Sequence, residues 1–274
     1  MCVSAEGARC TTCERTFECR AGIWRCLHEP EKYEAFLEAY RRLRAAEGWG
    51  STDASYYLAL PEVGADDPQR AIWRRRAQHF AQLLRVLPQR VQRVLDAGAG
   101  NGWLAYQLAQ RGHHVAALDI SDDARDGLGA HVHYPAHFEC YQAEFERLPF
   151  GAGQFDWVIY NGALHYVRTL APALAQARRV LRTGGHVVVM DSPFYTNAAS
   201  GEAMVAEQER RLYGNGQLER YVGYLTRCDV ERAAREAGLR LTKHYARDGW
   251  RLLRAWTARR VGREPASFPI VVME

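Results

Sequence analysis

The sequence has very few lysines and no long hydrophobic run. Only Lys32 and Lys243 are lysines, so nearly all of the 36 basic side chains are arginines, and 32 acidic side chains leave a net charge of +4. This charge is too small to predict a nucleic-acid partner by itself. The most apolar stretches, such as residues 187–190, are far shorter than the roughly 20 residues that span a bilayer. The first 20 residues also lack the apolar segment of a secretory signal, so we expect a cytoplasmic protein.

The overall composition is that of a folded globular chain. Hydrophobic residues make up 47% and charged residues 25% of the 274 residues, close to the average for such proteins. This excludes intrinsic disorder, collagen-like repeats and a coiled coil. A chain of this length can bury a core without needing disulfides.

The cysteines are concentrated near the N-terminus, where five of the seven lie within the first 26 residues. Four of them have a spacing that suggests one structural Zn²⁺ site: Cys10, Cys13, Cys19 and Cys26. A hairpin that turns at residues 21–22 would place Cys19 opposite Trp24 and on the same face as Cys26. His28 is an alternative to Cys19 as a ligand. The other interpretation is that the cysteines are reduced and structural, since a disulfide is not expected in a reducing compartment.

Changes of pattern divide the chain into three parts. We expect residues 1–29 to form a cysteine-rich module and residues 30–90 a helical lid or cap, in which apolar residues recur at helical spacing. Within the second part, the aromatic and turn-rich residues 49–68 are expected to form a loop or a short lid. Residues 91–274 form the main domain, with an insertion at residues 191–224 after the fifth strand.

The main domain alternates short apolar runs with helical segments. Predicted strands cover residues 93–95, 115–118, 138–141, 157–160 and 186–190, with late strands at 239–244 and 268–272. Predicted helices cover residues 102–110, 122–128, 170–181 and 226–237. This order predicts an α/β fold, a Rossmann-like, doubly wound and mostly parallel sheet with helices on both faces. Continuous apolar runs are typical of strands that are buried on both sides.

A glycine-rich turn follows the first of these strands. Its residues are Asp96, Gly98, Gly100 and Gly102 in a D-x-G-x-G-x-G pattern, and Asp119 ends the next strand. Glycines in this context let the backbone approach a ligand closely, and an acid at the end of the second strand can accept both hydroxyls of a ribose. A dinucleotide fingerprint needs a small residue at position 103, where this chain has Trp103. A nicotinamide oxidoreductase is therefore the least favoured hypothesis.

The turn resembles the first motif of class I S-adenosylmethionine (SAM)-dependent methyltransferases. Residues 143–150, A-E-F-E-R-L-P-F, are similar to a second motif of that family, with Glu144 where aspartate is more usual. Residues 155–166 resemble its fourth-strand motif, and residues 181–185 resemble the turn before strand five. The resemblance covers residues 91–190, and this region is similar to the type 11 methyltransferases. It implies the family's seven-stranded fold and SAM as the cofactor.

The resemblance also implies which residues bind the cofactor. The turn would lie along the methionine tail and ribose, Asp119 would bind the ribose hydroxyls, Ile120 would flank the adenine, and Glu144 would accept from the adenine amine. The complete predicted set is Asp96, Gly98, Gly100, Asn101, Gly102, Asp119, Ile120, Glu144, Phe145, Asn161 and Gly162. His165, just after the fourth strand, is the predicted general base if the acceptor must lose a proton. The acceptor pocket is expected at the insertion, residues 191–224.

These features predict a methyltransferase with a small-molecule acceptor and no membrane partner. An alternative is an rRNA base methyltransferase that grips RNA with its cysteine-rich module, although that module lacks a dense basic or aromatic face. A third hypothesis is a non-catalytic SAM-fold binding module, which the complete set of motifs disfavours.

Overall fold

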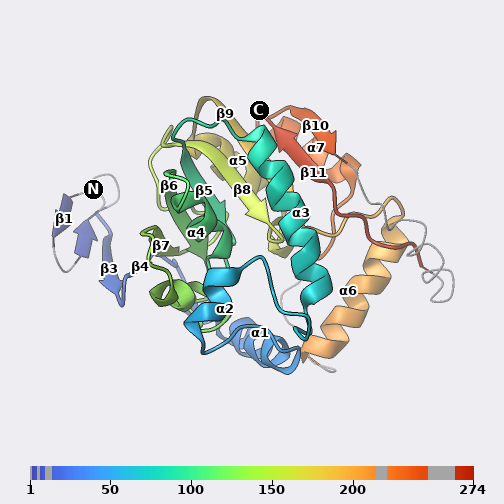
Figure 1. The fold of residues 1–274 in the computed structure, drawn as a ribbon. Coiled ribbons are helices and arrows are strands. Elements are labelled where there is room, and N and C mark those ends of the chain that lie inside the picture. The colour runs from blue at the N-terminus through green and yellow to red at the C-terminus, as the bar shows by residue number, and fades with distance from the viewer. Residues whose placement is uncertain (1, 5–6, 10–13, 214–220, 246–262) are drawn as a thin grey trace.

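One mixed sheet runs through the molecule. The computed structural model describes residues 2–4, 7–9, 14–213, 221–245 and 263–274. In this part of the chain the sheet has eleven strands, in the order β1-β2-β3-β4-β7-β6-β5-β8-β9-β11-β10 (Figure 1). The strands are β1 (Cys2–Ser4), β2 (Gly7–Arg9), β3 (Thr16–Arg20), β4 (Ile23–Arg25), β5 (Arg93–Ala97), β6 (His114–Asp119), β7 (Glu139–Gln142), β8 (Phe155–Asn161), β9 (Leu181–Met190), β10 (Leu241–Tyr245) and β11 (Ile270–Met273).

Helices lie on both faces of this sheet. The α-helices are α1 (Glu34–Ala46), α2 (Ala54–Ala59), α3 (Arg70–Val86), α4 (Trp103–Ala109), α5 (Leu170–Val180), α6 (Ala198–Tyr213) and α7 (Arg227–Glu236). Short 3₁₀ helices are η1 (Pro30–Tyr33), η2 (Leu128–His133) and η3 (Leu164–Tyr166). The predicted α/β fold with helices on both faces of the sheet is confirmed. The sheet is mixed rather than mostly parallel, because the pairs formed by β1–β4 and by β9–β11 are antiparallel.

The core consists of two apolar layers, one on each side of the sheet. On one side, α3 and α4 contribute buried side chains such as Trp73, Leu83 and Leu104. On the other side, α5 and α7 contribute Leu174 and Val230. The central strands β5 and β8 are buried along most of their length, which explains their continuous apolar sequence.

The strand order reverses at β5, and this reversal locates the site. The chain runs from β5 outward to its parallel neighbour β6 and on to β7, then crosses back to β8 on the other side of β5. Connections therefore leave β5 and β8 in opposite directions, and a crevice opens at their carboxyl ends. Ligands of open α/β sheets bind at such a point.

The sheet is wider than the seven strands expected, because the N-terminal segment joins it. Strands β3 and β4 form a hairpin around Ala21 and Gly22, in which Cys19 lies opposite Trp24. Strand β4 then pairs in parallel with β7. A strand at the edge of a sheet exposes unpaired backbone groups, and the hairpin satisfies those of β7. The cysteine-rich segment thus continues the sheet of the main domain.

Two segments differ locally from the prediction. The helix expected at residues 122–128 is absent, because Asp123 Oδ1 accepts hydrogen bonds from the backbone N–H groups of Arg125 and Asp126. Such side-chain bonds compete with helix formation. The segment expected to be a loop at residues 49–68 contains the short helix α2, which begins after Asp53, whose side chain accepts from the backbone N–H of Ser55.

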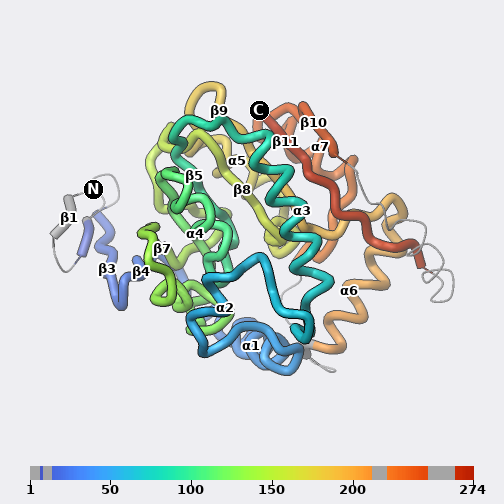
Figure 2. Tube along the Cα trace, in the orientation of Figure 1, coloured from blue at the N-terminus to red at the C-terminus, as the bar shows by residue number. Residues whose placement is uncertain are grey.

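The insertion after β9 reaches the N-terminal helices. Helix α6 packs against α1 (Figures 1 and 2), and Arg211 of α6 pairs with Glu47 at 2.9 Å.

None of the helices in the described residues combines the length and apolar character that a membrane crossing requires.

Candidate active site

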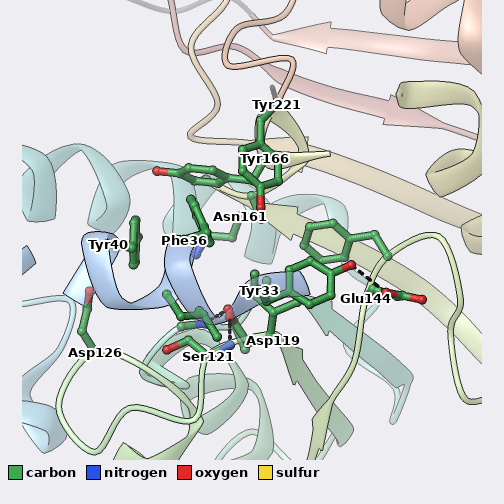
Figure 3. Close-up of a pocket in the computed structure, with 18 of the residues that line it drawn as sticks. Tyr33, Phe36, Tyr40, Asp119, Ser121, Asp126, Glu144, Asn161, Tyr166 and Tyr221 are labelled. Atoms are coloured by element: carbon green, nitrogen blue, oxygen red, sulfur yellow. Dashed lines mark hydrogen bonds between the residues drawn. The ribbon is translucent and has the colours of Figure 1, made fainter. Parts of the chain in front are cut away.

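A cavity opens at the carboxyl ends of β5, β6 and β8. Its empty space, open mouth included, is about 1020 Å³. The lining comes from the glycine turn, the ends of β6 and β8, the loop after β7, and helix α1 (Figure 3). The cavity thus lies where the reversal of strand order predicts a ligand.

The glycine turn forms one wall with its backbone. Gly98 has φ +81° and Gly100 has φ +55°, values that L side chains rarely adopt. A Cβ at Gly98 would lie 2.2 Å from the Cβ of Ala163, so only glycine fits there. Gly98, Gly100 and Asn101 line the cavity. Gly102 is not in the lining, because it lies behind the turn and begins α4 with φ +79°.

Asp119 connects the end of β6 to this turn. Its Oδ2 accepts from the backbone N–H of Gly100 at 2.8 Å, and its Oδ1 accepts from the N–H of Ser121 at 2.9 Å (Figure 3). Burial raises the pKa of Asp119 to about 6, although these hydrogen bonds oppose the shift. Each carboxylate oxygen has a second lone-pair direction, which remains available to a ligand hydroxyl.

The other predicted cofactor residues surround the same space. Ile120, Glu144, Phe145 and Gly162 line the cavity together with Asn161, whose buried Oδ1 has no hydrogen-bond partner among the described residues. Glu144 Oε2 accepts from the hydroxyl of Tyr33 at 2.6 Å (Figure 3). The structure thus brings nine of the eleven predicted cofactor residues together around one cavity.

Sequence reasoning missed the side chains that complete the cavity. Helix α1 and the turn before it contribute Tyr33, Phe36, Leu37, Tyr40 and Arg44. Their helical spacing was visible in the sequence, but it indicated only an apolar face. Arg44 pairs with Asp126 across the cavity mouth, with its Nη2 3.0 Å from Oδ1, and its guanidinium lies 3.6 Å from the centre of the Trp49 ring.

Arg76 of α3 is the other missed residue. It lines the cavity, and its Nη2 is 3.9 Å from the position that a Cβ on Gly162 would take. Its buried Nε has no hydrogen-bond partner among the described residues. The guanidinium lies 4.6 Å from the ring centre of Trp73 and 5.1 Å from that of Trp49. No motif marks Arg76, because it lies within a run of three arginines on a helix.

Comparison with known proteins agrees with this geometry. Residues 95–189 match the family described as a methyltransferase domain. A malonyl-[acyl-carrier protein] O-methyltransferase of Geobacter sulfurreducens is 31% identical over 192 residues, which cover 66% of this chain and 68% of that protein. The chain belongs to the S-adenosylmethionine-dependent methyltransferase family.

Other relatives of this methyltransferase are matched over less of their length. A biotin biosynthesis bifunctional protein of Cellvibrio japonicus is 27% identical over 76% of this chain. A malonyl-[acyl-carrier protein] O-methyltransferase of Erwinia pyrifoliae is 36% identical over 37% of this chain. The chain spans only 37% of the length of each of these two relatives.

A solved structure shares the fold of this methyltransferase. Geranyl diphosphate C-methyltransferase from Streptomyces coelicolor A3(2) superimposes with a TM-score of 0.61 at 16% identity, covering 90% of this chain and 98% of that one. At this identity the likeness concerns the fold alone. It extends beyond the region that the family match covers.

Asp96 does not lie in the cavity lining, although it belongs to the predicted cofactor set. Its side chain is fully buried behind the glycine turn. Burial raises its pKa to about 8, the charge of Asp119 adds to the shift, and the backbone N–H of Ala105 opposes it. The structure thus places Asp96 beneath the ligand-facing surface.

We expect these two aspartates to make the ligand-free protein less stable as pH rises. The folded state holds their protons more tightly than the unfolded chain, so the free energy of unfolding falls between about pH 4 and pH 8. Asp96→Asn removes one charge without changing the shape. At pH 8 it should raise the free energy of unfolding by a few kcal/mol, since one pKa unit corresponds to about 1.4 kcal/mol. Urea unfolding at pH 5 and pH 8 measures how far the free energy of unfolding falls in the natural protein and in the Asp96→Asn variant. An equal fall in the two proteins would contradict this prediction.

His165, the predicted base, is buried next to the cavity but does not line it. Its Nδ1 lies 3.2 Å from the Ser192 hydroxyl, and burial lowers its pKa to about 3. The imidazole is therefore neutral at physiological pH and is a weak base in this environment. The following residue, Tyr166, points into the cavity instead (Figure 3).

The predicted zinc site receives no support from the structure. Among the described residues, no three His, Cys, Asp or Glu side chains are grouped so that they could hold a metal ion. Cys10 and Cys13 lie outside the described residues. Cys19 is exposed, whereas Cys26 is part of the main core. Burial raises the pKa of the Cys26 thiol to about 12, which disfavours the thiolate that zinc requires.

The acceptor pocket was expected at the insertion, residues 191–224, and the described part of this insertion contributes one aromatic residue to the cavity. Tyr221 lines it, whereas Phe194 and Tyr195 are buried elsewhere. Helix α1 contributes four lining residues, namely Phe36, Leu37, Tyr40 and Arg44.

Proposed function

We propose that this protein transfers the methyl group of SAM to a small-molecule acceptor. The observation that carries the proposal is that residues from three separate sequence motifs, together with Asp119 and Ile120, meet around one cavity at the carboxyl ends of the strands. The names of the relatives also favour small or carrier-linked acceptors, since they include malonyl-[acyl-carrier protein] and ubiquinone biosynthesis O-methyltransferases.

The residues of the cavity fit the cofactor. At Gly98 a Cβ would clash with Ala163, so the turn presents bare backbone to the cavity, which suits the close approach of a ligand. Asp119 can accept from two ribose hydroxyls, and Ile120 and Phe145 offer apolar surface to the adenine. The unpartnered Oδ1 of Asn161 is an acceptor for a charged amine.

We assign the methionine carboxylate of the cofactor to Arg76. Among the arginines of the lining, Arg44 is already paired with Asp126, and Arg168 is exposed. Arg76 is a partly buried cation with an unpartnered Nε, and it lies near the end of β8. A carboxylate would satisfy its charge and its donors together.

Arg76→Gln should therefore weaken binding of both SAM and S-adenosylhomocysteine by about 10-fold or more, the effect of losing a hydrogen bond to a charged group. Adenosine lacks the methionine tail, so its affinity should not change. Arg74→Gln, an exposed position on the same helix, is the matched control. Calorimetric titration with the three ligands tests the assignment. An equal loss for adenosine would mean that Arg76 acts on the nucleoside or on the fold.

The reaction requires alignment more than acid–base chemistry. When bound, the cofactor supplies a methyl group on a sulfonium that is already a good leaving group. The contribution of the protein is to hold the acceptor in line and to exclude water, and positioning of this kind can supply roughly 7–11 kcal/mol. Burial raises the pKa of Tyr40 and Tyr166, so both phenols stay protonated and can hold an acceptor oxygen by hydrogen bonds. His165 remains only a predicted base.

Titration with SAM, S-adenosylhomocysteine and NADH tests the proposal directly. We expect the first two to bind and NADH to bind far more weakly, because Trp103 fills the space that a dinucleotide motif keeps open. Tighter binding of NADH than of SAM would overturn the proposal.

A further inference from the structure

We infer that the methyl acceptor is a planar aromatic molecule that stacks on a wall of four aromatic side chains. This aromatic wall consists of Phe36, Tyr40, Tyr166 and Tyr221. The inference rests on the proposed function, because it assigns the acceptor half of the same cavity.

The aromatic wall is assembled from three segments that are far apart in the sequence. Phe36 and Tyr40 lie one turn apart on α1, Tyr166 ends η3, and Tyr221 lies in the segment before α7. The ring centres of Phe36 and Tyr221 are 4.8 Å apart, those of Phe36 and Tyr40 5.6 Å, and those of Tyr40 and Tyr166 6.0 Å. These contacts hold the rings in one continuous surface.

This wall is on the acceptor side of the cavity. Figure 3 shows the four rings in an arc above Asp119 and Ser121, on the side away from the residues assigned to the ribose. Tyr40, Tyr166 and Tyr221 are half-buried rather than buried, and all four residues belong to the cavity lining. A ligand that contacts the wall would therefore share one cavity with the cofactor.

The chemistry of the wall favours a flat aromatic acceptor over a flexible aliphatic one. Aromatic rings gain from stacked or edge-to-face contact with another ring, beyond the burial of apolar area. The wall is rigid, because each ring packs against at least one other. Tyr40 and Tyr166 also offer protonated hydroxyls at the edge of the rings, which suits a phenol or a similar oxygen-bearing ring.

The test compares two ligands of matched size, 2-naphthol and its saturated analogue decahydro-2-naphthol. Their binding is measured by calorimetry on the full chain in the presence of saturating S-adenosylhomocysteine. We expect 2-naphthol to bind about 10-fold more tightly, the effect of one or two aromatic contacts. Tyr166→Leu and Tyr40→Leu should each reduce this preference about 3-fold or more. Tyr245→Leu, a half-buried tyrosine at the far edge of the sheet, should leave it unchanged.

Affinities for the cofactor separate the possible failures. The two wall variants should bind S-adenosylhomocysteine and SAM as the natural protein does. If they lose SAM but retain S-adenosylhomocysteine, the wall serves the sulfonium charge and the inference is wrong. Equal binding of the two naphthalene-derived ligands, or a preference that survives in both variants, would also overturn it. If the natural protein binds no S-adenosylhomocysteine at all, the proposed function fails and the inference fails with it.

Discussion

Replacing Asp119 by alanine is expected to weaken SAM binding about 100-fold or more. The carboxylate is placed to accept from both ribose hydroxyls, and a hydrogen bond to a charged group contributes about 1.5–3 kcal/mol. The substitution also removes the acceptor that holds the backbone N–H of Gly100, which lies 2.8 Å from Oδ2. The turn would then be less ordered before the ligand arrives, which adds to the loss. Calorimetric titration measures the affinity.

The pH dependence of binding adds a second readout for Asp119. Because burial raises the pKa of this carboxyl to about 6, its ionised form becomes the major species only above that pH. The affinity of the natural protein for SAM should therefore rise between pH 5 and pH 7. The Asp119→Ala variant should lack the part of this rise that comes from ionisation of Asp119. Asp122→Ala, in the same loop but paired with Arg25 at the surface, is the control and should change affinity less than about 2-fold. Unchanged affinity in Asp119→Ala would show that the ribose lies elsewhere.

Gly98→Ala is expected to be the most damaging single-methyl change in the protein. The new Cβ would lie 2.2 Å from the Cβ of Ala163 and 3.1 Å from the ring of Phe145, both at the cavity wall. Either the turn or the segment after β8 must move. In addition, alanine is strained at the φ of +81°. Together these effects should destabilise the fold by roughly 2–4 kcal/mol, and they should abolish measurable cofactor binding. Urea unfolding and calorimetry measure the two losses.

Gly112→Ala separates backbone strain from the clash. Gly112 has φ +84°, almost the same as Gly98, but a Cβ there would meet nothing within 4 Å. This variant should lose only about 1 kcal/mol of stability, from the unfavourable φ. It should bind SAM normally. Equal damage in the two variants would mean that φ alone makes Gly98 necessary and that the contact with Ala163 is unimportant.

Nine of the eleven residues that the sequence predicted for the cofactor line one cavity, because their signals are local. The requirement for glycine at positions 98 and 100 comes from the conformation of one turn. The place of Asp119 follows from the end of the next strand, which parallel pairing carries to the same edge of the sheet. Alternation of apolar runs and helices predicted the two helical layers for the same reason. In these segments, near neighbours in the chain determine the structure.

The sequence predicted local structure less well where a residue pairs with a distant segment of the chain. The helix expected at residues 122–128 is replaced by turns, and two partners from the N-terminal part hold that loop. Arg25 pairs with Asp122 at 2.6 Å, and Arg44 pairs with Asp126. The hairpin of residues 16–25 was expected within the cysteine-rich module, and its strand β4 pairs with β7 of the main sheet. Neither pairing leaves a periodic pattern in the sequence.

The sequence by itself determined the methyltransferase fold, the glycine turn and the acid that faces it, since each depends on backbone geometry within a few residues. Only the tertiary structure decided which side chains complete the cavity. Arg76 and the aromatic wall come from α3, α1, η3 and the segment before α7, and these elements meet only after the sheet has formed. The same packing placed Asp96 beneath the turn and His165 outside the lining. Burial, charge pairing and ring contacts across the fold thus set the chemistry of the side that we propose for the acceptor.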